Sequence, residues 1–486
     1  MRLNRWFALG AAAVAAVATA HPAFAQDAAQ ALPFDPEAAT REWLATMGPE
    51  ATERSNSYFE GGYWIQFVGP VLSFIVAFAF LQFGFADKLR SWLKSTVKVY
   101  FFVVVGFALV YTILGSIISF GWDYWVGFVR QHDYNLSTQT FSQWLTEYLQ
   151  GAGIGLVIGS IAIGLLYLII SAAKKTWWIW GTIASIVFVA FIGMLAPVYL
   201  SPIFNTYTPM PESSLRESVL QIAQANGVPT DDVLVYDRSR QTNSVSANVS
   251  GFAGTTRISL ADTLLQRESP GGVRAVMAHE IGHYVLQHTA SLLVMNALLI
   301  VVVFGLANLL FNRLSANQRW GITGISDPAG MPMLFSIIGF LMLLATPIGN
   351  NITRFHEHQA DMFGLNAARE PDGFAESAIL LSEYRKMDPT PLEEWFFYDH
   401  PSGYARVRMA MEWKAHHMAL GDIPQGPGGP GDWRPDFVTG HPDPRAVGYT
   451  APNAEGGGAT QSAAPATTTA TGTATTTATS TATTAP

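Results

Sequence analysis

Two histidines and a glutamate form the stretch of this sequence with the clearest chemistry. His279, Glu280 and His283 stand in the order His-Glu-x-x-His, in a helix-favouring run that begins near Pro270. Positions four apart lie about 40° apart around a helix, so both imidazoles can reach one ion. Glu280 then lies beside the open coordination position, where it can take a proton from an attacking water. The spacing predicts a zinc site with His279 and His283 as ligands and Glu280 as the base.

A zinc centre of this kind needs a third protein ligand. A metzincin would continue with glycine at position 286 and histidine at 289, but these positions hold Leu286 and Thr289, which excludes that class. His288 follows His279 by nine residues, about half a turn around a continuous helix. We therefore expect His288 to point away from the ion and to have a structural role.

A second cluster, at residues 353–361, is the better source of the third ligand. Glu357 and Asp361 are four apart and share a helix face, so one could bind zinc while the other orients a ligand imidazole. His356 and His358 flank Glu357 on other faces and are the alternative ligands. An ordinary charged helix surface is the competing explanation. Cysteine is absent from the chain, so the metal must be held by nitrogen and oxygen.

The composition indicates a membrane protein. Only 13% of the 486 residues are charged and 49% are hydrophobic, whereas a soluble domain carries about 25% charged residues. A net charge of −8 without a basic patch argues against a nucleic-acid partner. Six apolar segments are long enough to cross a bilayer as helices: 64–85, 99–120, 151–170, 177–200, 290–311 and 331–349. We predict a polytopic protein whose partners are the lipid bilayer and a peptide or protein substrate.

The basic residues predict the orientation in the membrane. Five of the seven lysines lie in two short loops, and Arg313 and Arg319 lie between the last two apolar segments. The lysines are Lys88, Lys94, Lys98, Lys174 and Lys175. The positive-inside rule places these loops in the cytoplasm. Residues 122–150, 201–289 and everything after 350 then face outward, with the catalytic region on the extracytoplasmic side of the cell (inner) membrane.

From about residue 64 to 411 the sequence resembles the type I CAAX prenyl proteases, integral-membrane zinc metalloendopeptidases of the gluzincin kind. The similar segments are residues 197–205, 257–264, 354–361 and 400–407. The family pattern R-x-x-E-x-x-A-D matches Arg354 to Asp361. The resemblance implies Glu357 as the third ligand of one zinc ion per chain. It also implies a catalytic role for Asp361 as proton donor, and orienting a ligand histidine is the physical alternative.

The same resemblance implies substrate contacts. His400 and Arg406, in the motif H-P-x-x-x-x-R, would contact the substrate or stabilise the oxyanion. The family's substrate-binding edge strand carries Asn-Ala, whereas this chain has Ser246, Ala247 and Asn248. Backbone pairing of an extended peptide survives that change because it uses main-chain groups. Eukaryotic members present the catalytic side to the cytosol, so the predicted orientation argues against a prenylated cytosolic protein as the natural substrate.

The expected fold is mainly α: a polytopic helical membrane protein, with a helical barrel enclosing a chamber and a zincin-like catalytic domain containing a small β-sheet. We expect a helix at 211–226, strands at 232–237, 244–250 and 256–260, and helical structure over 352–420. The predicted organisation is as follows: signal peptide 1–25, polar segment 26–62, transmembrane domain 63–200, protease domain 201–289, two transmembrane helices 290–350, the rest of the catalytic domain 351–423, and a linker with a disordered Ala/Thr-rich tail 424–486.

Two alternatives to CAAX-type processing remain open. One is a quality-control protease that clears damaged membrane or exported proteins, because heat-shock membrane proteases share the same zinc motif. The other belongs to a different class, a catalytically silent membrane scaffold or transporter. The intact Glu280 weighs against a silent site, since a scaffold has no need of the base.

Overall fold

The computed structural model describes residues 34–251, 256–316, 320–423, 429–431, 433 and 435. Within these residues, six helical stretches are long and apolar enough to cross a membrane. They are Gly48–Gln82, Tyr100–Asp133, Phe141–Ala172, Trp177–Phe204, His288–Ser315 and Pro328–Ala368. Each overlaps one predicted apolar segment, so the prediction of six spans is confirmed. The predicted signal peptide, Arg319 and the Ala/Thr-rich tail lie outside the described residues.

The spanning helices pack around a shared aromatic core. α3 (Gly48–Gln82), α5 (Tyr100–Tyr124), α7 (Phe141–Ala172), α8 (Trp177–Leu195), α13 (His288–Ser315) and α14 (Met331–Ala368) are its long members. Phe107, Tyr167 and Phe311 are fully buried between them. Other apolar side chains, such as Ile117 and Val187, are more than 60% exposed. Such an outward apolar surface is what a lipid-facing helix presents.

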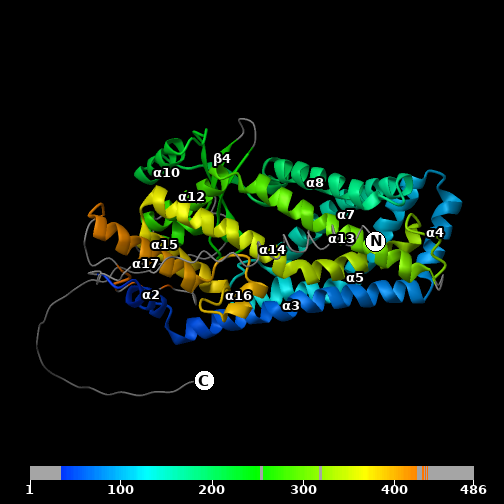
Figure 1. The fold of residues 1–486 in the computed structure, drawn as a ribbon, viewed down its shortest axis with the longest axis horizontal. Coiled ribbons are helices and arrows are strands. Elements are labelled where there is room, and N and C mark those ends of the chain that lie inside the picture. The colour runs from blue at the N-terminus through cyan, green and yellow to red at the C-terminus, as the bar shows by residue number, and fades with distance from the viewer. Residues whose placement is uncertain are drawn as a thin grey trace, which may run out of the picture. The chain divides into compact units, whose positions relative to one another are not determined.

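A short helix, α4 (Phe85–Thr96), joins α3 to α5 at the end of the spans away from the sheet (Figure 1). Arg90 of α4 pairs with Asp327, which is buried just before α14. The exposed lysines Lys88 and Lys94 also lie on α4. The first group of predicted cytoplasmic lysines therefore lies at this end of the helices.

At the other end, marked by β4 in Figure 1, the described residues form a small mixed sheet of four strands. The strand order is β1-β2-β4-β3. β1 (Tyr207–Pro209) and β3 (Ala247–Ser250) run antiparallel to their neighbours, whereas β2 (Val233–Tyr236) and β4 (Arg257–Ala261) pair in parallel. The three predicted strands are confirmed, and β1 is an addition. The sheet shares one apolar core with α10 (Ser214–Ala225) and α12 (Pro270–Val285).

Local sequence signals set the start of α12. Ser269 caps the helix by accepting a hydrogen bond from the backbone of Gly272, and Pro270 occupies the first turn, where its missing N–H costs nothing. Met277 and Ile281 are fully buried against the sheet. The predicted helix beginning near Pro270 is therefore confirmed. Met277 and Ile281, four residues apart, lie on the face of the helix that packs against the sheet.

The region predicted as helical over 352–420 consists of several helices rather than one. α14 runs on from the membrane to Ala368 and ends at Arg369, which has φ 57°. α15 (Pro371–Leu380), the 3-10 turn η5 (Leu381–Tyr384), α16 (Pro391–Phe397) and α17 (Gly403–Leu420) follow. An N-terminal helix, α2 (Pro36–Ala45), packs on α15 and α17.

Candidate zinc peptidase site

α12 and α14 approach closely at the point where they supply the metal ligands. A Cβ on Gly364 would lie 3.0 Å from the backbone nitrogen of His279, so glycine at this position permits the contact. α12 is continuous through both histidines, which places their imidazoles on one face as the spacing predicted. His279 Nε2 lies 3.1 Å from His283 Nε2.

Glu357 of α14 completes the group. Its Oε2 lies 3.3 Å from His279 Nε2, and its Oε1 lies 3.5 Å from His283 Nε2. Tetrahedral zinc with Zn–N bonds of about 2.0–2.1 Å requires ligand atoms about 3.3 Å apart. Glu357 Oε2 is buried and makes no hydrogen bond of normal geometry in the described part of the chain, although ring nitrogens of His279 and His400 lie within 3.3 Å of it. Two imidazole nitrogens and a carboxylate at these separations match the donor set and spacing of a zinc site, so His279, His283 and Glu357 suit zinc.

The rival ligand His356 faces another way. Its Nδ1 lies 2.8 Å from the carbonyl oxygen of Ile352, and its Nε2 lies 2.8 Å from Ser291 Oγ. Both ring nitrogens are thus engaged away from His279 and His283. His358, the other rival, is not part of the ligand group that the described residues form.

Asp361 lies behind His279 rather than in front of the metal site. Its side chain is fully buried, and Oδ1 lies 2.8 Å from His279 Nδ1. Arg406 donates to both of its oxygens, at 3.0 Å from Nε and 2.5 Å from Nη2. This geometry matches the orienting role that the sequence left open. The guanidinium of Arg406 is thus paired with Asp361, although Arg406 also lines the pocket.

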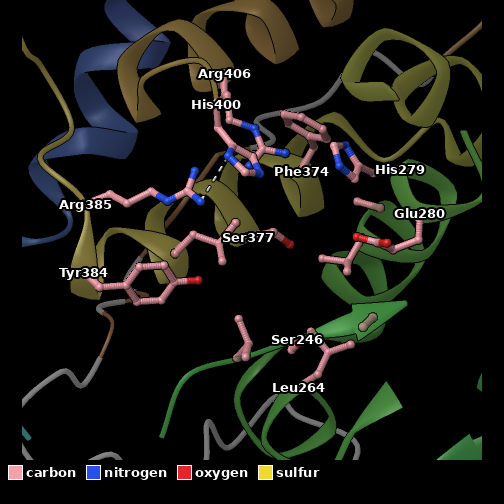
Figure 2. Close-up of a pocket in the computed structure, with 15 residues that line it drawn as sticks. Ser246, Leu264, His279, Glu280, Phe374, Ser377, Tyr384, Arg385, His400 and Arg406 are labelled. Atoms are coloured by element: carbon pink, nitrogen blue, oxygen red, sulfur yellow. Dashed lines mark hydrogen bonds between the residues drawn. The ribbon is translucent and has the colours of Figure 1, made fainter. Parts of the chain in front are cut away.

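A pocket opens beside the ligand His279 (Figure 2). His279 and Glu280 lie on one side of it, and Tyr384 and Arg385 lie opposite. Ser246 also lines the pocket, together with Ala247 at the start of β3.

β3 is one of the two edge strands of the described sheet. Asn248, the last of the three residues predicted to contact the substrate, pairs with Ser259 of β4 and does not line the pocket.

Glu280 is partly buried beside the ligands, with its carboxylate toward the pocket (Figure 2). Burial raises the pKa of Glu280 above its ordinary value, and the neighbouring His279 and His283 work against that rise. The position of Glu280, next to a ligand and facing the pocket, is the one that a general base for an attacking water requires.

His400 approaches the ligands from the C-terminal region. Its Nε2 lies 3.2 Å from Glu357 Oε2, and its Nδ1 lies 2.8 Å from Asp399 Oδ1. Arg385 Nη2 lies 3.3 Å from His400 Nδ1. Asp399 and Arg385 were not predicted from the sequence. An acid directly before His400 was a usable signal, whereas Arg385 belongs to no motif.

His288 corrects one prediction. Its Nδ1 lies 3.0 Å from Nδ1 of the ligand His283, so it does not point away from the site. The prediction assumed one continuous helix. Instead α12 ends at Val285, Gln287 adopts φ 55°, and α13 begins at His288. This break turns the side chain of His288 back toward the metal ligands.

Comparison with known proteins agrees with this site. Residues 209–414 match peptidase family M48, and residues 37–206 match the domain described as CAAX prenyl protease N-terminal, five membrane helices. Between residues 37 and 206 the structure has four candidate spans, one fewer than that description.

Two curated relatives align over most of their lengths. The metalloprotease YhfN of Bacillus subtilis (strain 168) is 26% identical over 368 residues, covering 75% of this chain and 86% of its own. CAAX prenyl protease 1 of Saccharomyces cerevisiae is 25% identical over 383 residues, covering 73% of this chain and 84% of its own. The crystal structure of S. mikatae Ste24p shares the fold, with a TM-score of 0.63 over 77% of this chain and 95% of that one, at 21% identity.

The spans and the His-His-Glu site define a multi-pass membrane zinc metallopeptidase. Specifically, the chain belongs to peptidase family M48 and carries the N-terminal membrane domain of the CAAX prenyl proteases. His279, His283 and Glu357 hold its zinc ion. When bound, zinc supplies a Lewis acid that polarises the scissile carbonyl and makes water easier to deprotonate.

Proposed function

We propose that this peptidase binds its substrate as an extended strand along β3 and cleaves it in front of the zinc ligands. The observation that carries the proposal is a single pocket whose wall includes both Glu280 and the start of the edge strand, at Ser246 and Ala247. An edge strand offers unpaired backbone groups to a peptide, and this pairing does not depend on the peptide's side chains.

Each polar group at the pocket then has one task. Glu280 takes the proton from the attacking water and returns it to the leaving amine. His400, held through Nδ1 by Asp399, contacts the oxygen that becomes negative. Asp361 acts behind the site, with Arg406 holding it, to keep His279 oriented.

The names of the relatives make a CAAX-type carboxy-terminal peptide the first substrate class to test. The lysine distribution favours the second candidate, clearance of membrane or exported proteins, because the positive-inside rule predicts a catalytic region outside the cytoplasm. The two candidates use the same chemistry and differ in the substrate that reaches β3.

The test uses the purified full chain with three substrates: a prenylated CAAX peptide, the same peptide without the lipid, and an unfolded exported protein. Glu280→Gln should lower cleavage about 10²–10⁴-fold while zinc content stays at that of the unmodified protein. Glu412→Gln, at an exposed ion pair on α17, is the matched control and should cleave normally.

Unchanged cleavage by Glu280→Gln would reject the role of the base. Cleavage of none of the three substrates by the unmodified, zinc-loaded protein would favour the silent scaffold. Preference for the prenylated peptide would support CAAX-type processing, and preference for the unfolded protein would support quality control.

A further inference from the structure

The ligand His283 has its second ring nitrogen turned toward another histidine. Its Nε2 faces the metal ligands, 3.1 Å from His279 Nε2, and its Nδ1 lies 3.0 Å from Nδ1 of His288. The rings of His283 and His288 are nearly perpendicular, at 79°, with centroids 4.9 Å apart. His288 is only 3% exposed. The contact is therefore buried and has the distance of a hydrogen bond.

The positions of the protons determine which of the two histidines donates this hydrogen bond. A histidine that binds zinc through Nε2 is neutral and carries its proton on Nδ1. Two nitrogens 3.0 Å apart can share only one proton, so His283 donates and His288 Nδ1 accepts. His288 then carries its own proton on Nε2, a buried nitrogen that makes no hydrogen bond of normal geometry in the described part of the chain.

The backbone is bent to place His288 at this position. Gln287 has φ 55°, a left-handed conformation that is unfavourable for a residue other than glycine. If Gln287 had a helical conformation, α12 would continue. Residue 288 would then lie on the side of the helix that faces away from the metal ligands. Strained backbone that re-aims one side chain is typical of functional sites.

His288 is also supported from behind by the helix that supplies Glu357. The ring of His356, on α14, lies 4.8 Å from that of His288 at 85°. His356 is fixed in turn, because its Nδ1 lies 2.8 Å from the carbonyl oxygen of Ile352 on the same helix. His288 thus fills the space between one zinc ligand and α14.

We infer that His288 is a positioning residue for the zinc centre, which accepts the Nδ1 proton of His283 and so fixes that ligand's tautomer and ring orientation. The two ligand histidines are held differently, His279 by the carboxylate of Asp361 and His283 by a neutral imidazole. The inference concerns metal binding. It does not depend on which substrate the peptidase cleaves.

The test compares zinc affinity, measured by competition with a chelating dye, in three variants of the full chain. His288→Phe keeps a ring without an acceptor, and we expect its affinity to fall about 10–100-fold. His288→Asn places an amide oxygen near the position of Nδ1, and its affinity should stay within a few-fold of the unmodified chain. His416→Phe, an exposed histidine on α17, is the matched control and should not change affinity.

The melting temperature of each zinc-free variant separates positioning from folding. A merely structural role would lower that temperature in His288→Phe and His288→Asn alike, without restoring zinc affinity in the latter. Equal affinity in the Phe and Asn variants would overturn the inference. If His288→Phe does not fold, His288→Ala replaces it, and equal affinity of the Ala and Asn variants has the same meaning.

Discussion

Asp361 makes its contacts from a position with no exposure to solvent. It accepts two hydrogen bonds from Arg406 and lies 2.8 Å from His279 Nδ1. A buried carboxylate is tolerated only when such partners replace its lost hydration. The residue therefore links the stability of the domain to the orientation of a zinc ligand, and the two effects can be measured separately.

Asp361→Asn should impair both properties. Loss of the carboxylate leaves the buried guanidinium of Arg406 without its counter-charge, which destabilises the protein by about 3–5 kcal/mol. The weaker acceptor behind His279 should lower zinc affinity about 10–100-fold. Thermal unfolding and dye competition measure the two effects.

Asp422→Asn is the matched control for this prediction. Asp422 pairs with Arg369 at the surface, where both side chains are more than 40% exposed. Such a pair contributes at most about 1 kcal/mol. A loss of stability in Asp361→Asn no larger than in Asp422→Asn would contradict the buried pairing.

Among individual residues, the sequence predicted those side chains that their spacing along one helix brings together. His279 and His283 share a face on any continuous helix, so their proximity needed no knowledge of the fold. His288 was misplaced because the break at Gln287 carries no glycine or proline that would have signalled it. Arg385 reaches the pocket through the turn that follows α15, a tertiary placement that no local pattern encodes. The roles of Glu280 and His400 remain predictions.

Between elements, the zinc site depends on how closely α12 and α14 approach each other. A Cβ on Gly364 would lie 3.0 Å from the backbone nitrogen of His279 and 3.2 Å from its Cα. Backbone atoms cannot yield as a flexible side chain can. The separation of the helix that carries two ligands from the helix that carries the third is thus set by the missing side chain.

Gly364→Ala should push the helices apart. Overpacking of this kind costs about 1–3 kcal/mol, and zinc affinity should fall because Glu357 moves away from His279 and His283. Gly349→Ala, on the same helix, is the matched control. Nothing lies within 4 Å of a Cβ there, and alanine favours a helix by about 1 kcal/mol over glycine.

Zinc affinity and thermal stability of both variants test this prediction. Normal zinc binding in Gly364→Ala would show that the crossing distance does not control the site. An equal loss in Gly349→Ala would attribute the effect to the helix itself rather than to its contact with α12.

The elements most accurately predicted are those with a long or strongly periodic signal. In the described part of the chain all six candidate spans follow from hydrophobic runs, and three of the four strands were also predicted. β1 was missed because it has three residues and ends in Pro209, so it is held by pairing with β2 rather than by local preference. The end of α14 at Arg369 lacks the usual glycine at its left-handed position, but Pro371, two residues later, is a helix-stop signal that the sequence does contain.

For the whole molecule, the placement of charge argues for one orientation. Lys88 and Lys94 lie on α4, Lys98 lies just after it, and Lys174 and Lys175 lie between α7 and α8. α4 is at the opposite end of the spans from the sheet and the zinc helix (Figure 1). Short loops rich in lysine stay in the cytoplasm. If they do so here, the zinc site faces away from prenylated cytosolic proteins.

The absence of cysteine makes this orientation directly measurable. Single cysteines at Lys98 and Lys175 mark the lysine-rich end, and matched cysteines at Glu212 and Gln221 mark the catalytic domain, all at exposed positions. A membrane-impermeant maleimide should label the second pair in intact spheroplasts and the first pair only after permeabilisation. Labelling of Lys98→Cys and Lys175→Cys in intact spheroplasts, with the other pair protected, would reverse the orientation. That outcome would bring the site to the cytosol and restore a prenylated cytosolic protein as the expected substrate.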